Sequence, residues 1–229
     1  MRYPNGRILI FAKTPVPGYA KTRLIPVLGA QGAAELHARL IHRTVGVAVE
    51  SRLAPVELWI CGDTGLDFFE SFRTSVDGRI HMQTGTDLGA RMGHAVGEAL
   101  HDAAFAVLIG TDCPVLDAVY LERACAALAD DRDMVLGPAE DGGYVLIGLG
   151  RPEPEIFKNV AWGTSAVLAQ TREQVRSLGL ACIELPVLWD VDEPGDLERL
   201  ARTLSVTDCQ QEVGMEHGRM SPYNKPHTR

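Results

Sequence analysis

The sequence predicts an α/β fold, a three-layer αβα sandwich around a mixed sheet that is mostly parallel with one antiparallel strand. Short apolar runs rich in Val, Ile and Leu alternate with longer segments of helical period, which is typical of parallel strands joined by crossover helices. One pair of runs is separated by too few residues for such a helix. The apolar content of 46% and the charged content of 23% are ordinary for a globular protein.

Seven apolar runs are predicted to be strands, namely residues 7–12 (RILIFA), 56–61 (VELWIC), 79–83 (RIHMQ), 105–110 (FAVLIG), 133–138 (DMVLGP), 144–149 (YVLIGL) and 181–186 (ACIELP). Between them, apolar residues recur at three- or four-residue steps and indicate buried helix faces, as in Ala33, Leu36, Leu40, Thr44 and Val47, and in Leu121, Ala124 and Leu128. The EDGG segment leaves room only for a turn, so the fifth and sixth strands should be antiparallel.

The chain is predicted to form one domain over residues 1–204, followed by a polar and mobile tail over residues 205–229. No apolar run approaches the ~20 residues of a membrane helix, and the start lacks the apolar segment of a secretory signal, which favours a cytoplasmic protein. The net charge of -8 disfavours a nucleic acid polymer as partner. The sequence does not indicate the oligomeric state.

Cysteines and histidines show no metal-binding pattern. The five cysteines lack a CxxC pair, which argues against a disulfide framework and a zinc site, and we expect them to be small buried residues. The histidines within predicted helices and strands form no ligand spacing and receive no role: His37, His42, His81, His94 and His101.

A basic loop, FAKTPVPGYAKTRL, follows the first predicted strand. Ligands of open α/β sheets bind outside the carboxyl ends of the strands, which is where Lys13, Lys21 and Arg23 lie. Two prolines stiffen this loop, and its cations match a diphosphate. A merely solvated loop is the alternative. Because neither GxGxxG nor a Walker sequence is present, a dinucleotide-binding dehydrogenase and a P-loop ATPase are excluded.

Carboxylates follow two other strands. Asp112 ends the strand at 105–110, and Asp190 and Asp192 follow the last strand with the spacing that places two side chains on one face. Such carboxylates are suitable ligands for Mg²⁺ or Mn²⁺. For Asp192, a capping role at the following helix is equally compatible with the pattern.

Two glycine-containing turns are further candidates. Gly85 and Gly89 allow close backbone approach, and Asp87 is placed to cap a helix, so a ligand contact and a plain strand-to-helix turn both fit this segment. Asp141 lies in the DGG turn between the antiparallel strands.

Six ordered segments resemble a family of bacterial glycosyltransferases with the nucleotide-diphospho-sugar transferase (GT-A, Rossmann-like) fold: FAKTPVPGYAKTRL, QTGTDLGARM, IGTDCP, PAEDGGYVLIGL, FKNVAWGTSAVL and WDVDEPGDL. The guanylyltransferases that act on phospholactate or on molybdenum cofactor are a more distant likeness. The usual DxD metal motif of such folds has two acidic residues, whereas GTDCP has one.

The resemblance implies a role for each matching residue. Lys13, Lys21 and Arg23 would face the diphosphate, with Gly85, Asp87, Gly89 and Arg91 near the nucleotide. Asp112 would be a metal ligand, with Asp190 or Asp192 as the second. Asp141 would be the general base on the acceptor side, which Tyr144, Trp162 and Thr164 would line.

Three functions are compatible with these residues. The first is a metal-dependent transferase that passes a sugar from a nucleotide diphospho-sugar to a small-molecule acceptor. The second is a nucleotidylyltransferase that joins a nucleoside triphosphate to a phosphorylated acceptor and releases pyrophosphate. The third is a nucleotide-binding module without catalysis. The resemblance favours the first.

Overall fold

The computed structural model describes residues 1–62 and 64–203. Met1–Pro194 form one compact unit, and a second unit begins at Gly195, with residues 196–203 helical. The tail expected over residues 205–229 lies outside the described residues, and the boundary at residue 204 stays a prediction. Within the described ranges, no helix has the length and apolar character needed to cross a membrane.

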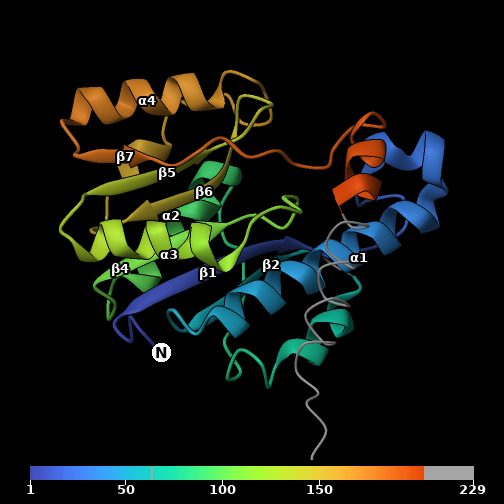
Figure 1. Cartoon of the computed structure of the whole chain (residues 1–229), viewed down its shortest axis with the longest axis horizontal. Helices are drawn as coiled ribbons and strands as arrows, with labels where there is room; N and C mark the ends of the chain where they lie inside the picture. Colours follow the sequence, from blue (N-terminus) through green and yellow to red (C-terminus); the bar gives the residue numbers. More distant parts are fainter. Residues whose placement is uncertain (63, 204–229) are drawn as a thin grey trace, which may run out of the picture. The chain divides into compact units, whose positions relative to one another are not determined.

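The first unit is built on a seven-stranded sheet with the order β3-β2-β1-β4-β6-β5-β7 (Figure 1). The strands are β1 (Gly6–Lys13), β2 (Val56–Cys61), β3 (Ile80–Met82), β4 (Phe105–Ile109), β5 (Met134–Pro138), β6 (Tyr144–Leu149) and β7 (Cys182–Glu184). Strand β6 pairs antiparallel with β4 and β5, and the other pairings are parallel. The predicted mixed sheet is therefore confirmed, because the short 139–143 link permits only a reversal.

Helices cover both faces of this sheet (Figure 1). They are α1 (Ile25–Ser51), α2 (Leu88–Ala99), α3 (Ala118–Ala129) and α4 (Val167–Leu178), with short 3₁₀ turns η1 (Thr22–Leu24), η2 (Leu66–Phe72) and η3 (Pro154–Phe157). One apolar core joins α1, α3 and η2 to one face, and the other joins α2, α4 and η3 to the opposite face. The predicted helix faces are buried, apart from the half-buried Val47. These two cores confirm the three-layer architecture.

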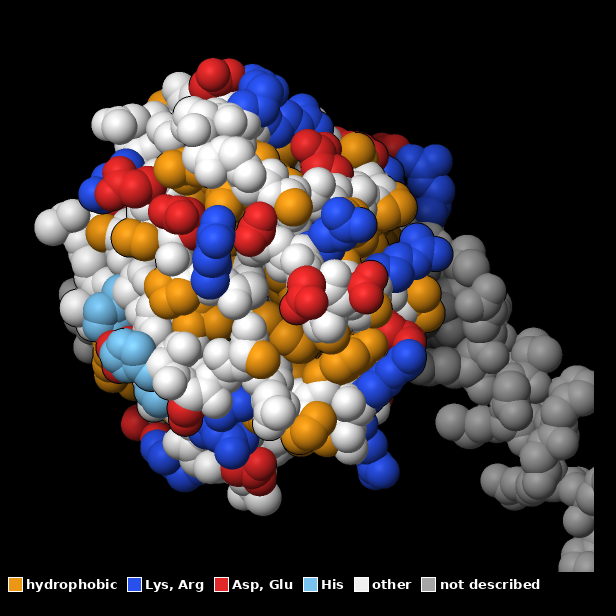
Figure 2. Space-filling model, turned by 90° about the vertical axis from the view of Figure 1, so that its left-hand side faces the viewer, with side chains coloured by type: hydrophobic (Ala, Val, Ile, Leu, Met, Phe, Trp, Pro, Cys, Tyr) orange, Lys and Arg blue, Asp and Glu red, His pale blue; other side chains and the backbone are white. Residues whose placement is uncertain are grey.

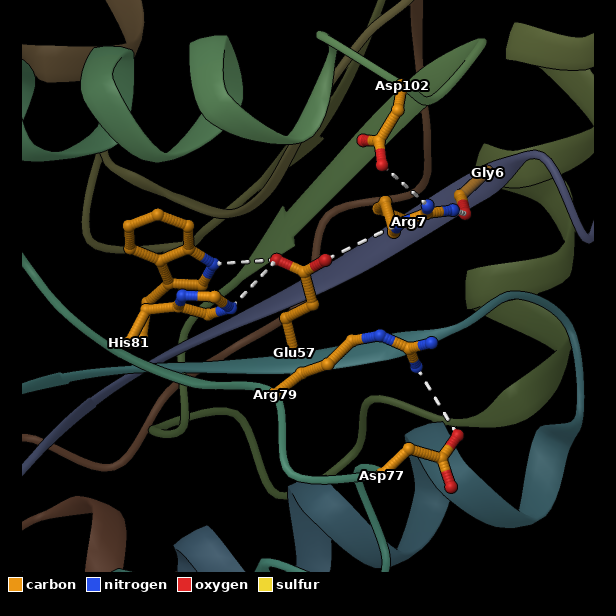
Figure 3. Close-up of polar contacts among 8 residues, drawn as sticks. Gly6, Arg7, Glu57, Asp77, Arg79, His81 and Asp102 are labelled. Carbon is orange, nitrogen blue, oxygen red and sulfur yellow. Dashed lines mark hydrogen bonds and ion pairs between the residues drawn. The ribbon is translucent and has the colours of Figure 1, made fainter.

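A buried carboxylate in β2 is held by a polar network (Figure 3). Arg7 Nε lies 3.4 Å from Glu57 Oε1, while Trp59 Nε1 donates to Glu57 Oε2 at 3.2 Å. His81 stacks on Trp59 with ring centroids 4.6 Å apart, and its Nε2 lies 3.6 Å from Glu57 Oε2. Burying an unpaired charge in a sheet costs folding free energy, and the ion pair with Arg7 compensates this cost for Glu57. This network stabilises the fold.

Figure 2 shows the side of the molecule that lies on the left in Figure 1, where β1 begins. A cavity of about 440 Å³ lies there, and its charged lining residues are Arg2, Asp131, Arg132, Asp133 and Arg151. Arg2 pairs with Glu122, and Arg151 Nη2 lies 3.5 Å from Asp133 Oδ1. Acidic and basic side chains are interspersed over this face (Figure 2), so it presents no field of one sign to a charged ligand.

Two of the cysteines differ from the expected burial. Cys113 and Cys125 are buried as predicted, whereas Cys61 and Cys182 are only half-buried because they end β2 and begin β7. Burial raises the pKa of Cys113 to about 11, which keeps its thiol protonated and inert at neutral pH. Cys209 lies outside the described residues.

Candidate functional site

The candidate site lies at the carboxyl ends of β1, β2 and β4. The antiparallel direction of β6 matters here, because it brings the 139–143 turn to the same edge: Ile109 pairs with Leu146, and Gly110 N donates to Val145 O at 3.2 Å. Segments from distant parts of the sequence therefore converge at one edge of the sheet, as expected for ligand sites of open α/β sheets.

The basic loop after β1 is folded back on itself. Lys13 Nζ donates to Tyr19 O at 2.8 Å, and the Tyr19 and Ala20 amides both donate to Val16 O, at 3.0 and 3.1 Å. Gly18 has a φ of 85°, in the left-handed region that glycine tolerates best. Lys13 remains solvent-exposed, so its ammonium is available to an anion at little cost in loop ordering.

Lys21 forms a buried ion pair with Asp112. Its Nζ lies 2.7 Å from Asp112 Oδ1 and also donates to Val191 O, and only 4% of its side chain is exposed. Burial raises the pKa of Asp112, but the Lys21 ammonium and His37 lower it by more, and the pKa is about 2. Asp112 is therefore ionised at neutral pH.

The two oxygens of Asp112 have different surroundings. Oδ1 is buried against Lys21, whereas 46% of the side chain as a whole remains exposed, which leaves Oδ2 as the open oxygen. Lys21 thus holds the buried oxygen of the carboxylate on the side away from solvent. An ionised carboxylate with one accessible oxygen is a suitable monodentate ligand for a hard cation.

Arg23 pairs with the segment that follows β7. Its Nη1 donates to Asp192 Oδ2 at 2.7 Å and lies 3.8 Å from Glu193 Oε1. The Arg23 side chain is 61% exposed, so this is a surface pair of small net energy that a stronger anion can displace. The arrangement ties the end of the basic loop to the acidic segment at residues 190–193.

Asp190 is the most perturbed carboxyl group of the site. Its burial raises the pKa, and the negative charges of Asp141 and Asp112 raise it further, to about 6. Three segments therefore place carboxylates near one another at the end of the sheet, an arrangement whose mutual repulsion a divalent cation would relieve.

The residues fit a divalent cation, although they do not form a complete shell. Across residues 1–62 and 64–203, no three His, Cys, Asp or Glu side chains are already arranged as a metal-binding group. Asp112 offers an open oxygen, and Asp190 is repelled by its acidic neighbours. Mg²⁺ is commonly held by one or two carboxylates together with phosphate oxygens, so a partial protein shell matches that mode of binding.

The start of α2 is shaped by two glycines. A Cβ on Gly85 would lie 2.7 Å from Arg91 N, and a Cβ on Gly89 would lie 2.5 Å from Trp162 Nε1. Asp87 Oδ1 accepts from Ala90 N at 2.8 Å, which confirms its expected capping role. Gly85 thus allows the preceding turn to lie against the first turn of α2, and Gly89 allows α2 to pack against Trp162.

Arg91 turns back toward β2. Its Nε donates to Asp87 O at 3.2 Å, and its Nη1 lies 3.1 Å from Cys61 Sγ. These contacts join the first turn of α2 to the carboxyl end of β2.

The expected acceptor-side residues differ in their exposure. Asp141 is exposed, with Oδ1 accepting from Gly143 N at 2.8 Å, and Thr164 is exposed with its hydroxyl donating to Ala161 O at 2.8 Å. The Tyr144 hydroxyl is buried, and this burial raises its pKa far above the usual value. The Tyr144 ring packs edge-on against the half-buried Trp162 at 6.4 Å, so it supports the tryptophan from the interior.

Comparison with known proteins identifies the family. Residues 44–164 match DUF2064, described as an uncharacterized protein conserved in bacteria. The chain belongs to this family. No curated protein matches its sequence.

Solved structures identify the fold. A protein from Desulfovibrio desulfuricans G20, assigned provisionally as a nucleotide-diphospho-sugar transferase, is 36% identical, with 87% of each chain covered and a TM-score of 0.79. CMP:2-keto-3-deoxy-manno-octonic acid synthetase complexed with CTP is 12% identical, with 89% of this chain and 99% of that chain covered and a TM-score of 0.59. Rv0371c of Mycobacterium tuberculosis H37Rv, in complex with manganese, is 15% identical, with coverages of 86% and 98% and a TM-score of 0.50. The last two share the fold alone, and the expected nucleotide-diphospho-sugar transferase fold is confirmed.

One contributor to this candidate site was missed from the sequence. His37, in the middle of α1, contacts both Asp112 and the basic loop, yet it occupies a position on a buried helix face that looks like ordinary core. The signal in the sequence was the position of His37, a polar residue on a largely apolar helix face. Its partners lie 24 and 75 positions away along the chain, so only the fold identifies them.

Proposed function

We propose that this protein is a metal-dependent transferase that binds a nucleotide diphospho-sugar and passes the sugar to a small-molecule acceptor. The observation that carries the proposal is the convergence of three acidic segments beside the basic loop: Val191 N donates to Asp112 O at 2.9 Å, and Glu140 N donates to Leu188 O at 3.0 Å. The charges of Asp141 and Asp112 contribute to the raised pKa of Asp190, which agrees with this proximity. The 36% identical structure from Desulfovibrio desulfuricans, provisionally a nucleotide-diphospho-sugar transferase, supports the choice of substrate class.

The basic residues are assigned to the departing diphosphate. Lys13 is exposed at the end of β1, and Arg23 has most of its side chain exposed at the end of the loop. Both can form charge-assisted bonds with phosphate oxygens, and these bonds strengthen as negative charge develops on the leaving group. Lys21 acts indirectly, because its buried ammonium keeps Asp112 ionised and in place.

The acidic residues are assigned to the metal and to the acceptor. Asp112 and Asp190 would hold Mg²⁺ or Mn²⁺, with Asp192 as a further candidate ligand. Such an ion would supply charge neutralisation at the diphosphate. Asp141, exposed in the 139–143 turn, would accept the proton of an acceptor hydroxyl.

The nucleotide and the acceptor are assigned to the two sides of α2. Gly85 precedes α2, Asp87 caps it, and Gly89 and Arg91 lie in its first turn; this segment is the one assigned to the nucleotide. Trp162, which is half-buried, and Thr164, which is exposed, would line the acceptor side.

The test is a panel of nucleotide diphospho-sugars incubated with the protein and Mn²⁺ or Mg²⁺. We expect slow release of a free nucleoside diphosphate from one donor, lost in the Asp112→Asn and Lys13→Ala variants but retained in Asp77→Asn, an exposed acid outside the site. Release of pyrophosphate from a nucleoside triphosphate, dependent on a phosphorylated acceptor, would show nucleotidyl transfer instead. Tight nucleotide binding that ignores metal and leads to no turnover would show a binding module.

A further inference from the structure

His37 lies directly behind the candidate site. It belongs to α1, and only 6% of its side chain is exposed. On one side of the ring, Nε2 lies 3.0 Å from the carbonyl oxygen of Lys13, where the basic loop begins. On the other side, Nδ1 lies 3.6 Å from Asp112 Oδ1. One imidazole therefore contacts both a phosphate-binding segment and a metal-binding carboxylate.

The chemistry of the two contacts fixes the orientation of the ring. A carbonyl oxygen can only accept, so Nε2 carries hydrogen and donates to Lys13 O. Nδ1 then faces the buried oxygen of Asp112 and has no hydrogen-bond partner among the described residues. A buried polar atom without such a partner is unusual, and functional sites are where such atoms are retained.

We propose that His37 is a positioning residue that sets the spacing between the basic loop and Asp112, and this rests on the proposed function. Its hydrogen bond to Lys13 O holds the start of the loop against α1. Its ring also packs beside Asp112 Oδ1 on the side away from solvent, where Lys21 Nζ pairs with that oxygen, so that Oδ2 is directed outward. Without the ring, the start of the loop loses its hydrogen bond to α1, and Asp112 Oδ1 keeps Lys21 but loses the imidazole packed beside it.

The ordinary alternative is a histidine that contributes packing alone, and α1 provides a control in His42, which is exposed but packs its ring on neighbouring side chains. His42 lies five positions further along α1, and its ring packs on Phe68 and Phe72 with centroids 5.4 and 4.6 Å away. It contacts no residue assigned to the site. The same substitution at the two positions separates positioning from packing.

The experiment compares His37→Leu, His37→Gln and His42→Gln in the full chain. Leu keeps the approximate volume and removes both polar contacts, whereas the Gln amide reaches about as far as Nε2 and retains a donor for Lys13 O. The first measurement is hydrogen exchange of the Tyr19 and Ala20 amides without ligand. The second is the affinity for UDP, GDP, CDP and ADP, by titration calorimetry with and without Mn²⁺.

We expect exchange of the two loop amides to accelerate about five- to tenfold in His37→Leu, with a similar loss of nucleoside diphosphate affinity, the range for one lost hydrogen bond. His37→Gln should restore most of the exchange protection, and His42→Gln should match the parent in both measurements. Unchanged loop exchange in His37→Leu would overturn the positioning role, and so would equal effects of His37→Leu and His37→Gln. A parent that binds none of the nucleotides would refute the proposed function, while the exchange measurement would still decide the role of His37.

Discussion

Replacing Asp190 by Asn should stabilise the protein at neutral and alkaline pH. Burial and the charges of Asp141 and Asp112 raise the Asp190 pKa from 3.8 to about 6, so ionising this group costs the folded state free energy. The difference between the two pKa values corresponds to about 3 kcal/mol. Because Asn also bears part of the burial cost, we expect a gain of about 1–2 kcal/mol, or roughly 2–8 °C in Tm for a chain of this size.

The stability difference between Asp190→Asn and the parent should depend on pH. A raised folded-state pKa means that the favourable contribution of Asp190 is fully present below pH 3.8 and is lost as the pH rises through about 6. The variant should therefore be more stable than the parent at pH 8, and the gain should disappear near pH 4. Urea unfolding at the two pH values measures both differences.

A control variant and a titration with Mn²⁺ test whether the charge of Asp190 causes the change in stability. Asp77→Asn removes an exposed carboxylate outside the site that pairs with Arg79, and it should change stability by less than about 0.5 kcal/mol. Mn²⁺ should stabilise the parent more than Asp190→Asn, because the variant lacks the charge that the ion neutralises. If Asp190→Asn is less stable than the parent at pH 8, or if the two differ equally at both pH values, then the carboxylates do not repel one another as inferred.

Three further predictions concern the loop, the packing of α2 and the buried charge. Arg23→Ala should weaken nucleoside diphosphate binding more than tenfold, because charge-assisted bonds contribute roughly 1.5–3 kcal/mol. Titration at fixed salt should show a far smaller loss of affinity for the bare nucleoside. Equal losses for the two ligands would instead indicate a collapsed loop. Gly89→Ala, whose Cβ would lie 2.5 Å from Trp162 Nε1, should displace that indole and shift its fluorescence, and an unchanged spectrum would contradict the packing. Arg7→Met leaves Glu57 buried without its cation and should cost about 3 kcal/mol in urea unfolding, whereas a cost below about 1 kcal/mol would show that the pair is not needed.

The fold was predictable because its signals are local. Strand and helix positions follow from apolar periodicity within windows of a few residues, and the antiparallel β6 follows from the length of the 139–143 link. Asp87 as a helix cap is equally local, since its side chain bonds an amide three positions later. The convergence of Lys13, Arg23 and Asp112 also needed only the rule that ligands bind at the carboxyl ends of parallel strands.

Contacts between distant segments were decided by the tertiary structure. Lys21 was expected beside the phosphates, yet it is buried against Asp112, 91 positions away, because β1 and β4 are neighbours in the sheet. Tyr144 was expected on the acceptor wall, but its hydroxyl points into the interior. His37 receives no role from the sequence, because its contacts with Lys13 O and Asp112 arise only when α1 packs behind β1 and the segment after β4. The amino-acid sequence determined which residue types stand at the strand ends. Strand order and helix packing determined which of these side chains come into contact, because such contacts depend on the arrangement of the whole sheet and not on a few neighbouring residues.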